Sequence, residues 1–312
     1  MRTGRASAIT DTGRRRPHNE DTFVCDPPLF AVADGVGGAQ AGEIASRLAA
    51  ATLEERQPGS LGEATLSALL LEANNRIYTR ALDDSNAAGM GTVVTALLVD
   101  EIAESVAIGH VGDSRAYRIR DETLVQLTPD HSLVGELVRA GRLSTEEAEQ
   151  HPHRSVITRA VGTEPVVEVH TETFQVSEGD LYLICSDGLT DLVRDEQILE
   201  LIAAAGSDPE AAAQSLVAAA NDAGGIDNIT VVLFEILDGD PVPPSPEPAD
   251  VEPDADTAEQ AVVLEVGAAT AAAATPPIQR HGAGAGGRWL AILAILLTIA
   301  VAALVIWWSL KR

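Results

Sequence analysis

Short apolar runs and longer amphipathic stretches alternate along roughly the first three quarters of the chain. Runs rich in branched and aromatic side chains, bounded by glycine, aspartate and proline, predict β-strands. The expected strands are Arg5–Asp11, Thr22–Cys25, a run ending at Asp34, Thr92–Val99, Ser105–Val111, Arg115–Arg120, Thr123–Gln126, Val166–Phe174, Leu181–Cys185 and Asn228–Ile236. Several of them follow one another directly, which is typical of antiparallel sheets rather than of β-α-β units.

The amphipathic stretches repeat apolar residues at helical spacing, as between Leu66 and Ile77. The expected helices are Gln40–Arg56, Leu61–Asp84, Ser132–Ala140, Glu196–Ala205 and Pro209–Ala223. Asp195 and Asp208 are expected helix caps, and Ser144 with Glu147 predicts the capping box of a further short helix. Helix pairs separated by runs of strands predict an α+β fold with two antiparallel sheets and helices outside them.

The remaining quarter differs in composition. Residues 239–288 are rich in proline, alanine, glycine and acidic side chains, which predicts an extended disordered linker. Trp289–Trp308 is a run of 20 residues without a charge and has tryptophan at both ends, which predicts a transmembrane helix. A buried core helix is the alternative. We therefore expect a globular domain over 1–238, the linker, one membrane span and a short basic tail over 309–312.

Charge and cysteine content narrow the class of protein. The net charge is −26, with 21 basic and 47 acidic residues, which argues against nucleic acid as the main partner. Cys25 and Cys185 each lie in an apolar run and predict free thiols in a reducing compartment. No segment before Asp21 resembles a signal peptide, so we expect the globular domain to be cytoplasmic. The basic residues flanking the membrane run leave its orientation undecided by the positive-inside rule.

Aspartates recur at the ends of the apolar runs. Asp34, Asp113 and Asp187 each adjoin a glycine after a strand-like run, and Asp227 comes just before one. A carboxylate at a buried strand end is costly unless a cation neutralises it. Each of these sites alone is typical of an ordinary turn, but their recurrence predicts a carboxylate cluster, and carboxylates favour hard divalent cations.

The order of these motifs resembles a known family. The motifs are Arg16 with Glu20-Asp21, Asp34-Gly35-Val36-Gly37-Gly38, Gly91-Thr92, Gly112-Asp113-Ser114-Arg115, Ser186-Asp187-Gly188 and Asp227-Asn228. Together they resemble the protein phosphatase 2C family in its bacterial form, over roughly residues 4–236. The resemblance implies an α-β-β-α sandwich and two Mn²⁺ or Mg²⁺ ions, with a third at a weaker site. It implies hydrolysis of phosphoserine and phosphothreonine by in-line attack of a water that the two ions activate.

The resemblance also assigns roles. Asp34 would bridge the two ions, Gly35 would bind through its carbonyl oxygen, and Asp187 and Asp227 would complete the first metal site. Asp113 with Asp187 would form the third site, which Ser155 would reach from a mobile flap spanning Gly135–Arg159. Glu20 and Asp21 would orient metal-bound waters, and Arg16 would hold the phosphate. Val36 stands where eukaryotic members have a histidine, so the general acid is unassigned; we expect His18 and His131 to be structural or exposed, and Arg14 and Arg15 to be solvated.

Partners and alternatives follow from the same comparison. A membrane run behind an acidic linker resembles the anchored phosphatases that bacteria pair with membrane-bound serine/threonine kinases. The expected partners are therefore phosphorylated proteins, including such kinases and their substrates, and the expected location is the cell membrane. One alternative is a phosphoprotein-binding scaffold without turnover, against which the complete set of aspartates argues. Another is a phosphatase for anti-sigma-factor antagonists, which usually carries a sensory domain ahead of the catalytic one.

Overall fold

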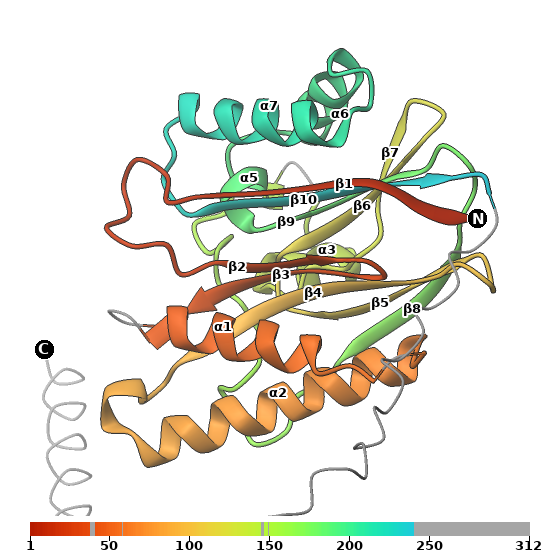
Figure 1. Cartoon of the computed structure of the whole chain (residues 1–312). Helices are drawn as coiled ribbons and strands as arrows, with labels where there is room; N and C mark the ends of the chain where they lie inside the picture. Colours follow the sequence, from red (N-terminus) through yellow and green to blue (C-terminus); the bar gives the residue numbers. More distant parts are fainter. Residues whose placement is uncertain (38–40, 58, 145–146, 149, 240–312) are drawn as a thin grey trace, which may run out of the picture. The chain divides into compact units, whose positions relative to one another are not determined.

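The computed structural model describes residues 1–37, 41–57, 59–144, 147–148 and 150–239. Figure 1 shows two sheets stacked face to face, with helices on both outer sides. The first sheet has the strand order β1 (Arg2–Asp11), β10 (Ile229–Leu237), β9 (Leu181–Cys185), β6 (Arg115–Arg120) and β7 (Thr123–Gln126). The second has the order β2 (Thr22–Asp26), β3 (Leu29–Val36), β4 (Gly91–Asp100), β5 (Ser105–Val111) and β8 (His170–Gln175). Neighbouring strands in both sheets are antiparallel, as the sequence predicts.

The helices form the two outer layers. Helices α1 (Ala41–Glu54) and α2 (Glu63–Asp83) cover the second sheet, and the 3₁₀ turn η1 (Ser85–Ala87) follows α2. Helices α6 (Asp195–Ala204) and α7 (Pro209–Asp222) cover the first sheet (Figure 1). The short helices α3 (Leu133–Arg139) and α5 (Asp187–Thr190) lie in the connections between strands. The predicted α-β-β-α arrangement is therefore confirmed.

Three clusters of buried apolar side chains lie between the two helical layers and the two sheets. One lies between α1, α2 and the second sheet, one between α6, α7 and the first sheet, and one between the two sheets. In the central layer Phe234 stacks on Phe30 with ring centroids 4.0 Å apart and on Tyr182 at 5.1 Å. Because aromatic side chains bury large areas, this stack contributes to the packing of the two sheets against each other.

Most predicted elements agree with the structure to within two residues at each end, although β1 begins at Arg2, three residues before its predicted start. Two other predictions are wrong. Strand β8 begins at His170 rather than Val166, because its partner strand β5 ends beside it and leaves residues 166–169 without a strand to pair with. Asp195 is the first residue of α6 rather than its cap, and its carboxylate accepts a hydrogen bond from Tyr117 at 3.0 Å instead. Asp208 does cap α7, since it accepts from the Ala211 N–H at 3.2 Å.

Two further expectations are confirmed. Ser144 and Glu147 form the predicted reciprocal capping box, with N···O distances of 2.8 and 3.2 Å. Cys25 and Cys185 are free, and burial raises the pKa of the Cys185 thiol to about 12. The predicted linker and the predicted membrane helix over Trp289–Trp308 lie outside the described residues. Within the residues that are described, no helix combines the length and apolarity needed to cross a membrane.

Candidate metal centre

Asp34 lies near the end of β3, which is flanked by β2 and β4 in the second sheet. The apolar residues Ala31, Val32 and Ala33 that precede it are at most 1% exposed. The strand continues through Gly35 to Val36, so Asp34 is two residues inside β3 rather than at its end. Its carbonyl oxygen accepts a hydrogen bond from the Thr92 hydroxyl at 2.7 Å. The neighbouring strand β4 therefore fixes the backbone from which the Asp34 side chain projects.

Gly35 is closely surrounded by other backbone segments. A side-chain carbon at this position would come within 2.5 Å of the Gly42 carbonyl oxygen and 2.7 Å of the Glu20 carbonyl oxygen. Glycine is therefore needed here because the start of α1 and the entry to β2 both approach β3 directly. The contact places Glu20 next to Asp34-Gly35, as the sequence predicts.

Asp21 joins the two sheets beside Asp34. Its Oδ2 accepts hydrogen bonds from the Ser186 hydroxyl at 2.9 Å and the Thr230 hydroxyl at 2.6 Å. Its Oδ1 is buried and has no hydrogen-bond partner among the described residues. Burial raises the pKa of the Asp21 carboxyl to about 6. The two hydroxyl donors were not assigned from the sequence, because they lie more than 160 positions away, one just after β9 and one in β10.

Asp187 and Asp227 come together through a contact between two turns. Asp187 begins α5 directly after β9, and Asp227 lies just before β10. A side-chain carbon on Gly188 would lie 2.0 Å from the Asn228 carbonyl oxygen, so the two turns are in direct contact. The Asp-Gly and Asp-Asn motifs are therefore neighbours in space although about 40 residues separate them in the sequence.

The Asn228 side chain forms hydrogen bonds that hold the β1–β2 loop against the turn before β10. Its Oδ1 accepts from the Glu20 N–H at 2.8 Å, and its Nδ2 donates to the carbonyl oxygens of Thr12 at 3.0 Å and His18 at 2.9 Å. The sequence motif contains Asn228 but does not reveal this role. An amide is suited to it because it both donates and accepts.

Asp113 follows β5 in a turn that is held in place by contacts with Asp130 and His131. Gly112, at φ 119°, donates its N–H to His131 Nδ1 at 3.0 Å and accepts from the His131 N–H at 2.7 Å. Arg115 forms an ion pair with Asp130 at 2.7 Å. Burial and the charge of Asp130 raise the pKa of the Asp113 carboxyl to about 6. Residues Asp130 and His131 thus position the turn that carries Asp113, as structural residues.

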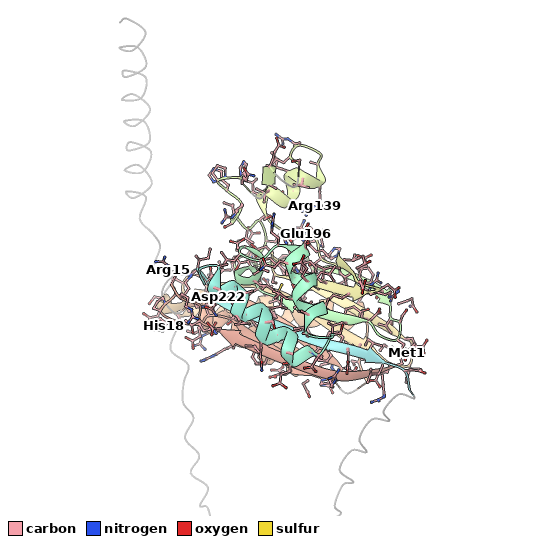
Figure 2. All side chains as sticks on the ribbon, turned by 90° about the horizontal axis from the view of Figure 1, so that it is seen from above. Met1, Arg15, His18, Arg139, Glu196 and Asp222 are labelled. Carbon is pink, nitrogen blue, oxygen red and sulfur yellow. The ribbon has the colours of Figure 1, made fainter. Side chains whose placement is uncertain are left out.

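Arg16 and Ser155 occupy the borders of the site. Arg16 is exposed and donates from Nη2 to Asp227 Oδ2 at 2.7 Å. Ser155 lines a pocket of about 760 Å³ together with Asp113 and Asp187. The segment that carries Ser155 is attached by an isolated bridge between Ser132 and Ile157, and Figure 2 shows the region near Arg139 projecting from the domain. The structure therefore brings every predicted site residue to one region.

The electrostatics show that the aspartates form one cluster. Burial raises the pKa of Asp34 well above its usual value, and the charges of Asp21, Asp187, Asp113 and Asp227 raise it further. Burial likewise raises the pKa of Asp187, with further contributions from Asp113, Asp227 and others. Without a cation these groups repel one another, so bound cations would relieve a real electrostatic cost.

The donor set fits hard divalent ions. It consists of carboxylate and carbonyl oxygens, which Mg²⁺ and Mn²⁺ prefer over nitrogen or sulfur ligands. Among the described residues, no three histidine, cysteine or acidic side chains are arranged to enclose a single ion. The carboxylates, with the Gly35 carbonyl oxygen at one of the sites, would therefore share the ions with water, as Mg²⁺ sites in proteins commonly do.

The chain is similar in sequence to a described protein family and to named bacterial proteins. A family model described as "Protein phosphatase 2C" matches residues 18–220. The serine/threonine protein phosphatase PstP of Mycobacterium tuberculosis is 41% identical over 241 residues, which cover 76% of this chain and 46% of PstP. The serine/threonine phosphatase stp of Listeria welshimeri is 38% identical over 238 residues, covering 72% and 93% of the two chains. This chain therefore spans about half the length of the mycobacterial relative and nearly all of the listerial one.

A solved structure extends the comparison to the fold. The crystal structure of the catalytic domain of PstP in complex with two manganese ions superimposes with a TM-score of 0.69 at 38% sequence identity. The match covers 75% of this chain and 98% of that one. The two chains therefore share their fold.

Proposed function

This chain belongs to the protein phosphatase 2C family, and on that basis we propose that it hydrolyses phosphoserine and phosphothreonine monoesters of proteins with Mn²⁺ or Mg²⁺. The observation that carries the proposal is the cluster of aspartates from separate segments whose charges raise the pKa of Asp34 and Asp187. The relative crystallised with two manganese ions supports the choice of metal.

Four residues would hold the principal ions: Asp34 as the shared ligand, Gly35 through its carbonyl oxygen, and Asp187 and Asp227. Asp113 and Asp187, with Ser155 from the flap, would hold a third ion. When bound, a pair of divalent ions lowers the pKa of water towards neutrality and neutralises charge on the phosphoryl group. The sequence and the aspartate cluster support these assignments.

The chain's own side chains would bind and orient the reactants. Arg16 suits a phosphate because its planar guanidinium donates to two oxygens at once and stays charged. In the structure it donates to Asp227, so phosphate binding would exchange one anionic partner for another. Asp21, held by Ser186 and Thr230, and Glu20 would fix the orientation of waters next to the ions.

The proton for the leaving alkoxide has no assigned side-chain donor. Burial lowers the pKa of His131 to about 4, so this imidazole is neutral at pH 7. Its Nδ1 accepts a hydrogen bond from the Gly112 N–H, so this nitrogen already has a structural partner. His18 is exposed, as expected from the sequence. A water molecule in the site could supply the proton.

We also propose that Trp289–Trp308 tethers the enzyme to the cell membrane, with the catalytic domain in the cytoplasm, where it opposes a serine/threonine kinase. This part rests on the sequence of that segment and of the acidic linker before it. Its test is the distribution of the full-length chain between membrane and soluble fractions, compared with a chain that ends at residue 288. Equal distributions of the two chains would contradict the tether.

The activity is tested on the purified full-length chain. Phosphate release from a phosphothreonine peptide should require Mn²⁺, stop on chelation and be lost in Asp187→Asn. Thermal unfolding of the variant shows whether it is folded, and calorimetric titration with Mn²⁺ shows whether the chain binds the ion. A folded, ion-binding chain that releases no phosphate would instead indicate a phosphoprotein-binding scaffold.

A further inference from the structure

The β1–β2 loop carries three consecutive arginines at the border of the metal centre. Arg14, Arg15 and Arg16 are all exposed. Arg16 is neutralised by Asp227 at 2.7 Å. Among the described residues, by contrast, the side chains of Arg14 and Arg15 form no hydrogen bond or ion pair. The loop therefore presents two positive charges that the fold itself does not use.

The backbone of the loop holds these charges in a defined place. The N–H groups of Arg14 and Arg15 both donate to the Gly225 carbonyl oxygen, at 2.7 and 3.2 Å. Gly13 adopts φ 76°, and its position leaves no room for a side chain against the Asp227 carbonyl oxygen. Because the backbone supplies these contacts, replacing the two side chains should leave the loop in place.

The two charges lie close to the expected phosphate position. The hydrogen bond with Asp227 raises the pKa of Arg16 most, and the charges of Glu20 and Asp34 are near enough to raise it further. Successive Cα atoms are about 3.8 Å apart, and an extended peptide advances about 3.4 Å per residue. Arg14 and Arg15 can therefore meet side chains within a few residues of a phosphoresidue bound at Arg16. Figure 2 shows the side chains of Arg15 and His18 at the end of the domain opposite Met1.

The surrounding charge makes this loop unusual. With a net charge of −26, the chain as a whole repels acidic partners. A local cluster of arginines is where an acidic segment gains favourable contacts, and complementary charge of this kind sets specificity and association rate more than raw affinity.

We propose that Arg14 and Arg15 bind acidic side chains flanking the phosphoresidue, so that the enzyme prefers phosphoproteins whose phosphorylated segment is rich in aspartate and glutamate. The inference rests on the proposed function and adds a substrate class to it. Arg14 and Arg15 select the substrate without touching the reacting atoms.

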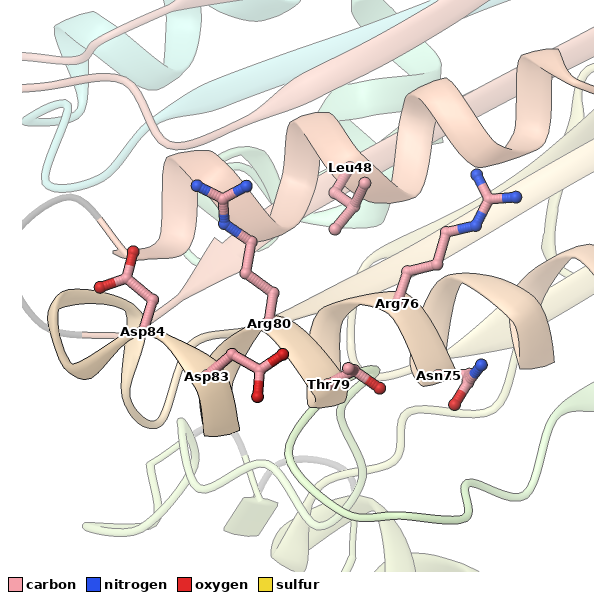
Figure 3. A pocket seen from close by; sticks show the side chains of 7 residues that line it. All are labelled: Leu48, Asn75, Arg76, Thr79, Arg80, Asp83 and Asp84. Atoms are coloured by element: carbon pink, nitrogen blue, oxygen red, sulfur yellow. The ribbon is translucent and has the colours of Figure 1, made fainter. Parts of the chain in front are cut away.

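The test compares three phosphothreonine peptides that differ only in having Asp/Glu, Asn/Gln or Lys flanks. The full-length chain is compared with Arg14→Gln/Arg15→Gln, with Arg15→Glu and with the control Arg80→Gln. Arg80 is an exposed arginine on α2, beside the pocket between α1 and α2 in Figure 3, and the described residues provide it with no ion pair. The Arg80→Gln control therefore removes one exposed positive charge that does not lie on the β1–β2 loop.

The double variant should lower kcat/KM roughly three- to tenfold for the acidic peptide, since each exposed ion pair contributes modestly. The neutral peptide should change little, and Arg15→Glu should shift the preference towards Lys flanks. The preference should fade at about 1 M salt, where the Debye length is about 3 Å. Equal losses for all three peptides, or the same loss in Arg80→Gln, would overturn the proposal.

Peptide binding separates this inference from the proposed function. Fluorescence anisotropy of the three labelled peptides measures binding without turnover. If the wild-type chain binds the acidic peptide best and the double variant loses that preference, the inference holds even when no phosphate is released. If phosphate is released from all three peptides at equal kcat/KM, the proposed function stands and the inference fails.

Discussion

At the residue scale, Asp34 combines a fixed backbone with a side chain surrounded by like charges. We predict that Asp34→Asn raises the melting temperature of the metal-free protein, because an amide neither adds charge to the repulsive buried cluster nor has to bind a proton on folding. The gain should be about 1 kcal/mol or more, which corresponds to roughly 2–4 °C for a domain of this size. The same variant should lose the stabilisation that saturating Mn²⁺ gives the wild type.

Thermal unfolding of both proteins with chelator and with Mn²⁺ measures the two effects together. Phosphatase activity should fall at least about 100-fold, the upper end of the loss that outer-sphere partners of a metal cause. A metal-free variant less stable than the wild type would show that the aspartates do not repel one another as described. Retention of the Mn²⁺ stabilisation would remove Asp34 from the metal site.

Asn228 supports a second prediction at this scale. Asn228→Ala removes three hydrogen bonds that hold the β1–β2 loop, at 2.8, 3.0 and 2.9 Å. We expect a loss of about 2–3 kcal/mol in the free energy of unfolding, because three partly buried backbone groups lose their partners. KM should rise more than kcat falls, since Arg16 lies on the released loop.

Urea unfolding and steady-state kinetics check this prediction, with Asn75→Ala on the exposed face of α2 as the matched control. A rise in KM equal to that of the control would show that Asn228 does not position the loop.

At the element scale, the sequence predicts the limits of a strand best where turn residues close to it in the sequence mark its ends. Strands β5, β6, β7 and β9 have the predicted limits, since residues with positive φ such as Asp121 and Glu122 mark the β6–β7 turn. The start of β8 could not be predicted, because it depends on where β5 ends. Helix α5 was also missed, since four residues are too few to show a helical period.

In the metal centre, too, residues marked by local sequence can be predicted, whereas residues that act through distant contacts cannot. The aspartates are recognisable because each stands beside a glycine or asparagine and next to an apolar run, which Asp227 precedes. The roles of Ser186, Thr230 and Asn228 are not, because the bonds they make to Asp21 and Glu20 span between 165 and 209 positions of sequence. Only the stacking of the two sheets brings these partners together.

The turn between β9 and α5 gives a prediction at this scale. Gly188→Ala should destabilise the fold by about 2 kcal/mol or more, because the added carbon would lie 2.0 Å from the Asn228 carbonyl oxygen and force the two turns apart. Mn²⁺ affinity should fall as well, since Asp187 and Asp227 lie on those turns. Chemical unfolding and calorimetric Mn²⁺ titration test both effects.

The control is Gly206→Ala, a position at which an added carbon meets nothing within 4 Å although its φ of 65° carries some strain. This control should cost stability without changing Mn²⁺ affinity. Equal Mn²⁺ affinities for Gly188→Ala and the wild type would separate the turn contact from the metal centre.

At the scale of the whole molecule, two sets of buried titratable groups have opposite effects on stability as pH changes. Burial lowers the pKa of His110 to about 3 and of His131 to about 4, below their unfolded value of about 6.5. Between these values the unfolded chain binds more protons, so the histidines make the fold less stable as pH falls. The aspartates of the metal centre have raised pKa values, so in the metal-free fold they bind more protons than in the unfolded chain and make it more stable as pH falls.

The pH dependence of stability between about pH 5 and 6 should therefore change sign when Mn²⁺ binds. Without metal, the aspartates of the centre outnumber the two histidines, and the free energy of unfolding should rise on acidification. With saturating Mn²⁺ the aspartates stay ionised, the histidine contribution remains, and stability should fall by about 1.4 kcal/mol per pH unit for each extra proton bound by the unfolded chain. Urea unfolding followed by circular dichroism at pH 5 and 6, with chelator and with Mn²⁺, measures the four values. Slopes of the same sign in both conditions would mean that the metal does not bind the clustered aspartates.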